Sequence, residues 1–163
     1  MIQIDADDTT GLDEFSLKWR WTDERHANLC DEERARIRPL RPAAAAAAWR
    51  LSIGSVSEEL ELDPSVYEDV ERAPARTKSD SGFLTRLPAG RIPVVVSWDQ
   101  HTAVLTDSEL FVQRWDDFCY PSSDDVTVIP VDESWLLHYS RGEEFLFARK
   151  RNSFRAQAGR AIS

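Results

Sequence analysis

The sequence has little of several residues on which common catalytic and cofactor sites depend. It contains only two cysteines, Cys30 and Cys119, which lie far apart and form no C-x-x-C pair. Two cysteines so placed predict free thiols, as expected for a cytoplasmic protein. The six glycines form no phosphate-cradling loop or dinucleotide-binding motif, and neither G-x-S-x-G nor H-E-x-x-H occurs. The sequence therefore favours neither nucleotide binding nor these hydrolase chemistries, and we predict no cofactor and no catalytic residue.

Long apolar runs and an excess of basic residues are also missing. No apolar run approaches the roughly 18 to 20 residues that cross a bilayer, and residues 1–15 lack the pattern of a secretion signal. Twenty Lys and Arg residues against 29 Asp and Glu residues give a net charge of −9. Direct binding to nucleic acid is disfavoured, because phosphate neutralisation requires a basic surface. The acidic charge is compatible with a basic protein partner, a bound cation or simple solubility.

The first third of the chain predicts a mainly helical N-terminal part of a single domain, spanning residues 1–54. Apolar and polar residues alternate from Phe15 to Trp21, which predicts a strand, with a short helix near Leu12 as the alternative. Helix is expected over 22–37, with a possible break near Asn28 and a helix start at the acidic residues 31–33. Pro42, the six alanines that follow it and Gly54 predict a second helix ending near Ile53.

The middle of the chain is harder to interpret, whereas the last third has clear patterns. Residues 55–91 are acidic with scattered apolar residues, and we predict an irregular loop region there. Between 92 and 150 we expect a ββαβββ antiparallel sheet with helices packed on one face, which gives an α+β fold. Thr106 and Glu109 fit a helix capping box. Residues 151–163 form a basic tail that is expected to fray. The predicted strands are 94–98, 101–105, 126–129, 135–140 and 144–149, and the helix between the second and third carries Phe111, Trp115 and Phe118 on one face.

Four aspartates close to one another are the least explained charges in this last third. Asp116 and Asp117 fall near the C-terminal end of the predicted helix, where negative charge opposes the helix dipole. Asp124 and Asp125 follow within ten residues and would repel them. We interpret the cluster as a site for a cation, either basic side chains of a protein partner or a divalent metal. The alternative is that Asp124 and Asp125 merely occupy a turn.

Further carboxylates extend the predicted partner-binding surface. An acidic run in the middle of the chain predicts a second patch, and two glutamates in a predicted hairpin turn complete the set. No metal-binding residues are assigned, since the spacing of the aspartates is not that of a calcium loop. The added partner-binding residues are Glu58, Glu59, Glu61, Glu143 and Glu144.

Cysteine, histidine and aromatic residues offer alternative sites. Cys119 follows two aromatic residues and lies among carboxylates, so a buried structural thiol is expected in preference to a nucleophile. His26 and Cys30 are spaced for one helix face, but no second ligand pair supports a zinc site. Bulky residues on both faces of 135–140 indicate a central strand covered on both sides, although an exposed aromatic anchor for a partner is the alternative.

Several segments of the last third resemble a family of small uncharacterised bacterial proteins, a domain of unknown function. The shared features are W-x-x-F-C-Y-P-S-S-D-D at 115–125, a later Trp135 with Tyr139, and EEFLFAR at 143–149. The resemblance implies a bacterial cytoplasmic protein and brings no catalytic residues with it. By analogy of size and charge, such proteins look like immunity proteins encoded beside toxins.

These observations lead to one leading functional hypothesis and one rival. The leading hypothesis is a non-enzymatic immunity protein that neutralises a basic toxin through an acidic surface. The rival is a metal-binding protein or metal-dependent hydrolase that uses the four aspartates with His138. The sequence leaves the oligomeric state open.

Overall fold

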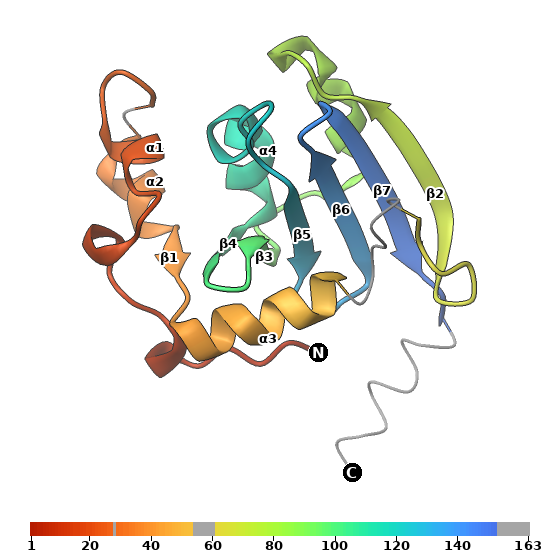
Figure 1. Ribbon diagram of the computed structural model, residues 1–163, viewed down its shortest axis with the longest axis horizontal. Coiled ribbons are helices and arrows are strands. Elements are labelled where there is room, and N and C mark those ends of the chain that lie inside the picture. The colour runs from red at the N-terminus through yellow and green to blue at the C-terminus, as the bar shows by residue number, and fades with distance from the viewer. Residues whose placement is uncertain (28, 54–60, 153–163) are drawn as a thin grey trace.

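The computed structural model describes residues 1–27, 29–53 and 61–152. Its centre is a seven-stranded antiparallel sheet with the strand order β1-β4-β3-β5-β6-β7-β2 (Figure 1). The predicted α+β class is therefore confirmed, with one sheet that extends beyond the expected strands at both edges. The strands are β1 Arg38–Pro39, β2 Tyr67–Pro74, β3 Pro93–Asp99, β4 Thr102–Asp107, β5 Val126–Pro130, β6 Trp135–Ser140 and β7 Glu144–Lys150.

Short helices and two longer ones surround this sheet. The described part of the chain contains no helix that is both long and apolar enough to span a membrane. The helical segments are η1 Ala6–Asp8, η2 Leu12–Glu14, α1 Trp19–Thr22, α2 Asp31–Ala35, α3 Pro42–Ile53, η3 Lys78–Arg86 and α4 Ser108–Phe118.

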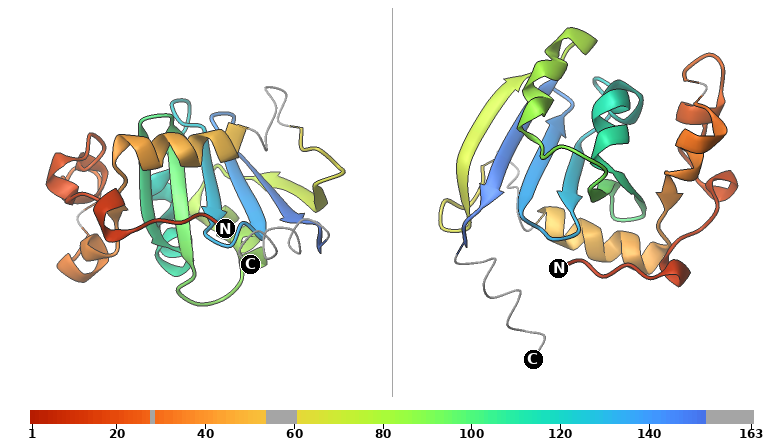
Figure 2. Two further views of the ribbon diagram at one scale, coloured as in Figure 1. Left: turned by 90° about the horizontal axis from the view of Figure 1, so that it is seen from below. Right: turned by 180° about the vertical axis from the view of Figure 1, so that it is seen from behind.

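The helices cover both faces of the sheet, so the prediction that they pack on one face is wrong. Alternate residues of a strand point to opposite faces, and β3 uses both of its faces for packing. Val95 contacts the α3 cluster that contains Ala45 and Ala48. Val94 and Val96 belong instead to the larger core, to which α4, η3 and α1 contribute. Figure 2 shows α3 lying across one side of the sheet and α4 on the other.

Helix α4 packs through an apolar stripe but begins differently from the sequence prediction. Phe111, Trp115 and Phe118 are buried at helical spacing, as expected. Thr106 does not cap the helix, because its buried side-chain oxygen has no hydrogen-bond partner among the described residues. Asp107 is the N-cap, and its carboxylate accepts a hydrogen bond from the backbone N–H of Leu110 at 2.9 Å.

The N-terminal region departs most from the prediction. Residues 15–21 form no strand, since α1 begins at Trp19 and η2 lies near Leu12. Both Arg20 and Trp21 are buried, which does not fit the half-buried strand that the alternation predicts. Trp21 stacks on Phe15 with ring centroids 5.9 Å apart. The expected helix over 22–37 is reduced to α2, which does begin at the predicted acidic turn.

The predicted irregular region also contains regular structure. Within it, β2 pairs with β7 at the sheet edge, and η3 follows. The strand was missed because β2 is an edge strand whose residues from Asp69 to Arg72 are exposed, so it lacks an apolar alternation. Residues 54–60, and 153–163 of the predicted basic tail, lie outside the described residues.

Candidate functional site

The four aspartates singled out in the sequence have different environments. Asp124 is buried and forms a two-pronged ion pair with Arg20, with Nη1 to Oδ2 at 2.5 Å and Nη2 to Oδ1 at 3.1 Å. Its Oδ2 also accepts the backbone N–H of Tyr120 at 2.8 Å. Asp124 therefore acts within the molecule, and this part of the predicted binding surface is wrong because its carboxylate is buried and already neutralised.

The Arg20 guanidinium is itself enclosed by aromatic rings. Its central carbon lies 4.4 Å from the centre of the Tyr120 ring and 5.7 Å from that of Trp98. Both Arg20 Nη1 and the Trp98 indole N–H donate hydrogen bonds of 3.0 Å to the carbonyl of Phe118. These contacts hold the segment from Phe118 to Asp124 against α1, and they explain the unusual density of aromatic and charged residues there.

Asp125 is also paired within the chain, at the surface. It accepts hydrogen bonds from the backbone N–H and the guanidinium of Arg141 at 2.7 to 2.9 Å. Burial alone would raise the pKa of Asp125, but the hydrogen bonds from Arg141 hold it below its ordinary value. Both aspartate–arginine pairs line a cleft of about 370 Å³ together with Trp49 of α3. Within this cleft the two aspartates are neutralised by their arginines, and Asp99 adds a further carboxylate to the lining.

Asp116 and Asp117 lie in the last turn of α4 and behave differently from each other. Asp116 forms an ion pair with Lys78 of η3 at 2.7 Å. Asp117 has neither an ion pair nor a hydrogen bond with any residue in the described part of the chain. Burial raises the pKa of Asp117, and the nearby charge of Asp116 raises it further. The charges of Arg114 and Lys78 oppose part of this increase. Asp117 is thus a half-buried carboxylate without an ion pair among the described residues, at the helix end where the dipole also disfavours it.

A cluster of partly exposed aromatic residues lies beside this helix end. Trp19 packs edge-on against His26 at 4.5 Å and against Tyr120 at 5.4 Å between ring centres. The charge of Asp117 contributes to the raised pKa of Tyr120, after the larger effect of burial, which places the carboxylate near that ring. We call Asp116, Asp117, Trp19, His26 and Tyr120 the α4-end surface.

The remaining predicted partner-binding residues do not join this surface into one patch. Glu144 pairs with Arg72 at 3.1 Å, and Glu143 lies in the turn between β6 and β7. Glu61 precedes β2 at the opposite end of β7 from Glu144, as the register of Tyr67 with Lys150 shows. Glu58 and Glu59 lie outside the described residues. Of the three glutamates in the predicted second patch, Glu61 is the one that the structure describes, and it lies apart from the α4-end surface.

Cys119 and His138 are both buried, as a structural role requires. Burial raises the pKa of the Cys119 thiol well above its ordinary value, so it is a poor nucleophile. His138 Nδ1 lies 3.0 Å from Thr127 Oγ1 on the neighbouring strand. Among the described residues, no group of three or more His, Cys, Asp or Glu side chains is arranged to hold a metal ion.

Sequence reasoning identified the carboxylates but missed the cations and rings that surround them. Arg20, Lys78 and Arg141 come from three different segments, so no local pattern links them to the aspartates. The one available signal was Arg20 itself, a charged residue within an aromatic run.

No protein-family model, curated protein or solved structure matches the chain. The resemblance to small bacterial proteins therefore stays a prediction.

Proposed function

We propose that this protein is a non-enzymatic binding protein that receives a basic side chain of a protein partner on its α4-end surface. The observation that carries the proposal is the state of Asp117, a half-buried carboxylate that forms no ion pair or hydrogen bond with any described residue, so that the charges of Arg114 and Lys78 nearby offset only part of its own. Burying a charge without a partner destabilises a folded protein. An arginine or lysine of another protein would pair with Asp117 and relieve this destabilisation, so the effect favours the complex over the free protein.

The neighbouring aromatic rings make the same surface suitable for protein recognition. Trp19 and Tyr120 are partly exposed and are held in position by Arg20, which contacts both rings at 5.3 and 4.4 Å. Aromatic residues that need no reordering on binding are frequent interface anchors. The adjacent carboxylates provide the charge complementarity that guides a basic partner to this surface.

The partner class we propose is a basic bacterial toxin, so that the protein acts as an immunity protein. A net charge of −9 on 163 residues suits rapid, salt-sensitive association with such a protein. The metal-dependent alternative is not carried forward, because Asp124 and Asp125 are occupied by Arg20 and Arg141.

Replacing Asp117 with asparagine distinguishes a binding role from a structural one. We expect Asp117→Asn to stabilise the free protein by roughly 0.3 to 1 kcal/mol, the effect of removing a negative charge from a helix C-terminus. We expect the same variant to weaken binding to the product of the adjacent gene by at least about tenfold. Urea unfolding and surface-immobilised binding at two salt concentrations measure the two effects.

The matched control is Asp13→Asn, which makes the same charge change at an exposed position on η2. It should leave binding nearly unchanged at moderate salt. Equal weakening by both variants, or loss of stability in Asp117→Asn, would contradict the proposed site. Failure of the adjacent gene product to bind the unmodified protein would remove the toxin as partner.

A further inference from the structure

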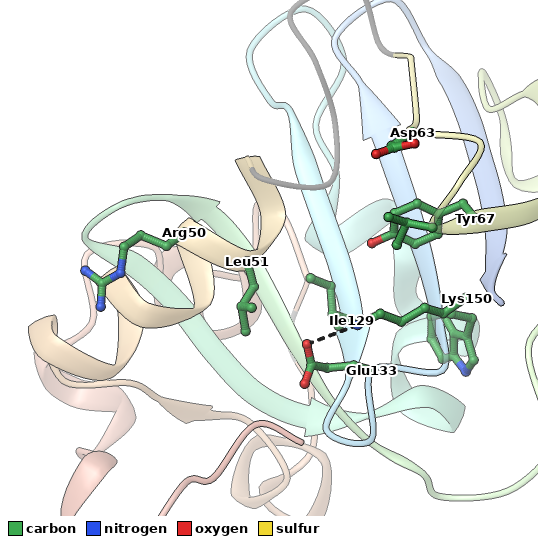
Figure 3. A pocket seen from close by; sticks show the side chains of 9 residues that line it. Arg50, Leu51, Asp63, Tyr67, Ile129, Glu133 and Lys150 are labelled. Carbon is green, nitrogen blue, oxygen red and sulfur yellow. Dashed lines mark ion pairs between the residues drawn. The ribbon is translucent and has the colours of Figure 1, made fainter. Parts of the chain in front are cut away.

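A second candidate site lies on the α3 side of the sheet, away from the α4-end surface. A pocket of about 210 Å³ opens between α3, the segment before β2, the β5–β6 turn and the end of β7 (Figure 3). Leu51, Val66, Ile129, Tyr67 and Trp135 provide most of its apolar lining. Its charged lining residues are Arg50, Asp63, Glu133 and Lys150.

Lys150 is a partly buried charged group in this pocket, and its hydrogen bonding is incomplete. Its side chain is only 21% exposed, and its Nζ lies 3.6 Å from Glu133 Oε1, which is too long for a good hydrogen bond. The amino group of Met1 lies closer to Glu133 than Lys150 does, with its nitrogen 2.8 Å from Glu133 Oε2. Within the described residues, the side-chain ammonium of Lys150 has no hydrogen-bond acceptor at normal distance. The Lys150 ammonium is therefore partly exposed in the pocket and keeps donor capacity for an additional anionic oxygen.

The apolar residues beside Lys150 limit what can supply that oxygen. Figure 3 shows Leu51 and Ile129 close to the Lys150–Glu133 pair, whereas Arg50 points away from it. A ligand that reaches the ammonium must therefore place apolar atoms against these aliphatic side chains. Fully hydrated anions such as phosphate would lose their water there without replacement contacts.

The volume of the pocket sets the size of the ligand. About 210 Å³ corresponds to roughly seven water molecules at their share of liquid volume. We propose that this pocket binds a small organic carboxylate with a branched aliphatic or similarly compact apolar body. The carboxylate accepts hydrogen bonds from Lys150 Nζ, and the body packs on Leu51, Val66 and Ile129. This inference does not depend on the proposed function of the α4-end surface.

Isovalerate and isovaleramide provide a direct test, since they have the same shape and differ in charge. We expect titration with isovalerate to give saturable changes in the amide NMR spectrum that are centred on residues lining the pocket. Isovaleramide should bind at least about tenfold more weakly, because it lacks the charge-assisted hydrogen bond to Lys150. Equal binding of the two compounds, or no saturable change with isovalerate, would overturn the proposal.

Three variants locate the site. Lys150→Gln should remove the preference for isovalerate, whereas Lys18→Gln, at an exposed lysine that contacts the carbonyl of Asp13, should retain it. Leu51→Trp fills the pocket from the surface of α3 without changing charge, and it should abolish binding even if Lys150→Gln folds poorly. Persistence of isovalerate binding in Leu51→Trp would show that the acid binds elsewhere and would refute the assignment.

Discussion

Arg20 and Asp124 form the least exposed ion pair in the described part of the chain, with side-chain exposures of 5% and 9%. Such a pair gains little over apolar residues of the same shape, because both charges must leave water. Removing one partner is different, since it leaves the other charge buried without compensation. The pair therefore contributes mainly by fixing the segment that follows α4.

Asp124→Asn is expected to lower the free energy of unfolding by about 3 to 5 kcal/mol, because it leaves the Arg20 guanidinium buried without its counter-ion. Urea unfolding followed by tryptophan fluorescence measures the loss. Asp125→Asn is the control, since its partner Arg141 is 66% exposed and water can replace the carboxylate. A similar loss in both variants would show that burial of the pair is unimportant.

We expect His138 to make the folded protein less stable as the pH falls into the mildly acidic range. Burial lowers the pKa of His138 below its ordinary value of 6.5, although the charge of Asp125 opposes part of this effect. The unfolded chain therefore binds the proton first as the pH falls. The contribution of His138 to the free energy of unfolding should be constant above about pH 6.5. It should decline as the pH falls below 6.5 and level off below the lowered pKa of the folded state.

We expect His138→Gln to flatten this decline between pH 7 and pH 5, whatever its effect on stability at neutral pH. Urea midpoints measured across the range give the slope. His101→Gln, at an exposed histidine of the β3–β4 turn, should keep the slope of the unmodified protein. An unchanged slope in His138→Gln would assign the acid sensitivity to other groups.

At the scale of elements, the alanines of α3 set how closely this helix approaches the sheet. Ala45 and Ala48 are almost fully buried against Val95, Ala103 and Leu105. Small side chains at these two positions leave no room for larger ones, because protein interiors are close-packed. The alanine run is thus more than a reflection of helix propensity.

Ala45→Leu is expected to destabilise the protein by roughly 1 to 3 kcal/mol, through overpacking against the sheet. Ala47→Leu is the matched control on the same helix, since Ala47 is exposed and leucine is nearly as good a helix former as alanine. Thermal unfolding monitored by circular dichroism compares the two. Tolerance of both substitutions would indicate that α3 can move away from the sheet at little cost.

The elements that the sequence predicted well are those whose side chains meet local partners. The strand residues from Val94 to Val96 are a continuous β-branched run, and the stripe of α4 has helical spacing, so each signal lies within its own element. The missed elements depend on distant contacts, as in Arg20 with Asp124 and in β2 with β7. For the same reason the aspartates could be found from sequence, whereas their neutralisation by Arg20, Lys78 and Arg141 could not.

On the scale of the whole molecule, stability is expected to decrease from the centre of the sheet to the β2 edge. Strands β5 and β6 are buried along their whole length, whereas β2 is exposed at most positions and contains a bulge between Glu68 and Glu71. Segments with few buried contacts open without global unfolding. Amide hydrogen exchange should therefore be faster in β2 than in β5 and β6, and equal protection across the sheet would contradict this gradient.

The Arg20–Asp124 pair has a further consequence for how the chain is made. Its two residues are 104 positions apart, and the ring of aromatic residues around Arg20 also closes only when Trp98 and Tyr120 are present. At typical synthesis rates of about 5 to 20 residues per second, Arg20 leaves the ribosome roughly 5 to 20 s before Asp124. The nascent N-terminal segment carries exposed tryptophans throughout that interval, so we expect it to be a chaperone-binding region during translation, until folding buries Trp21 and leaves Trp19 only partly exposed.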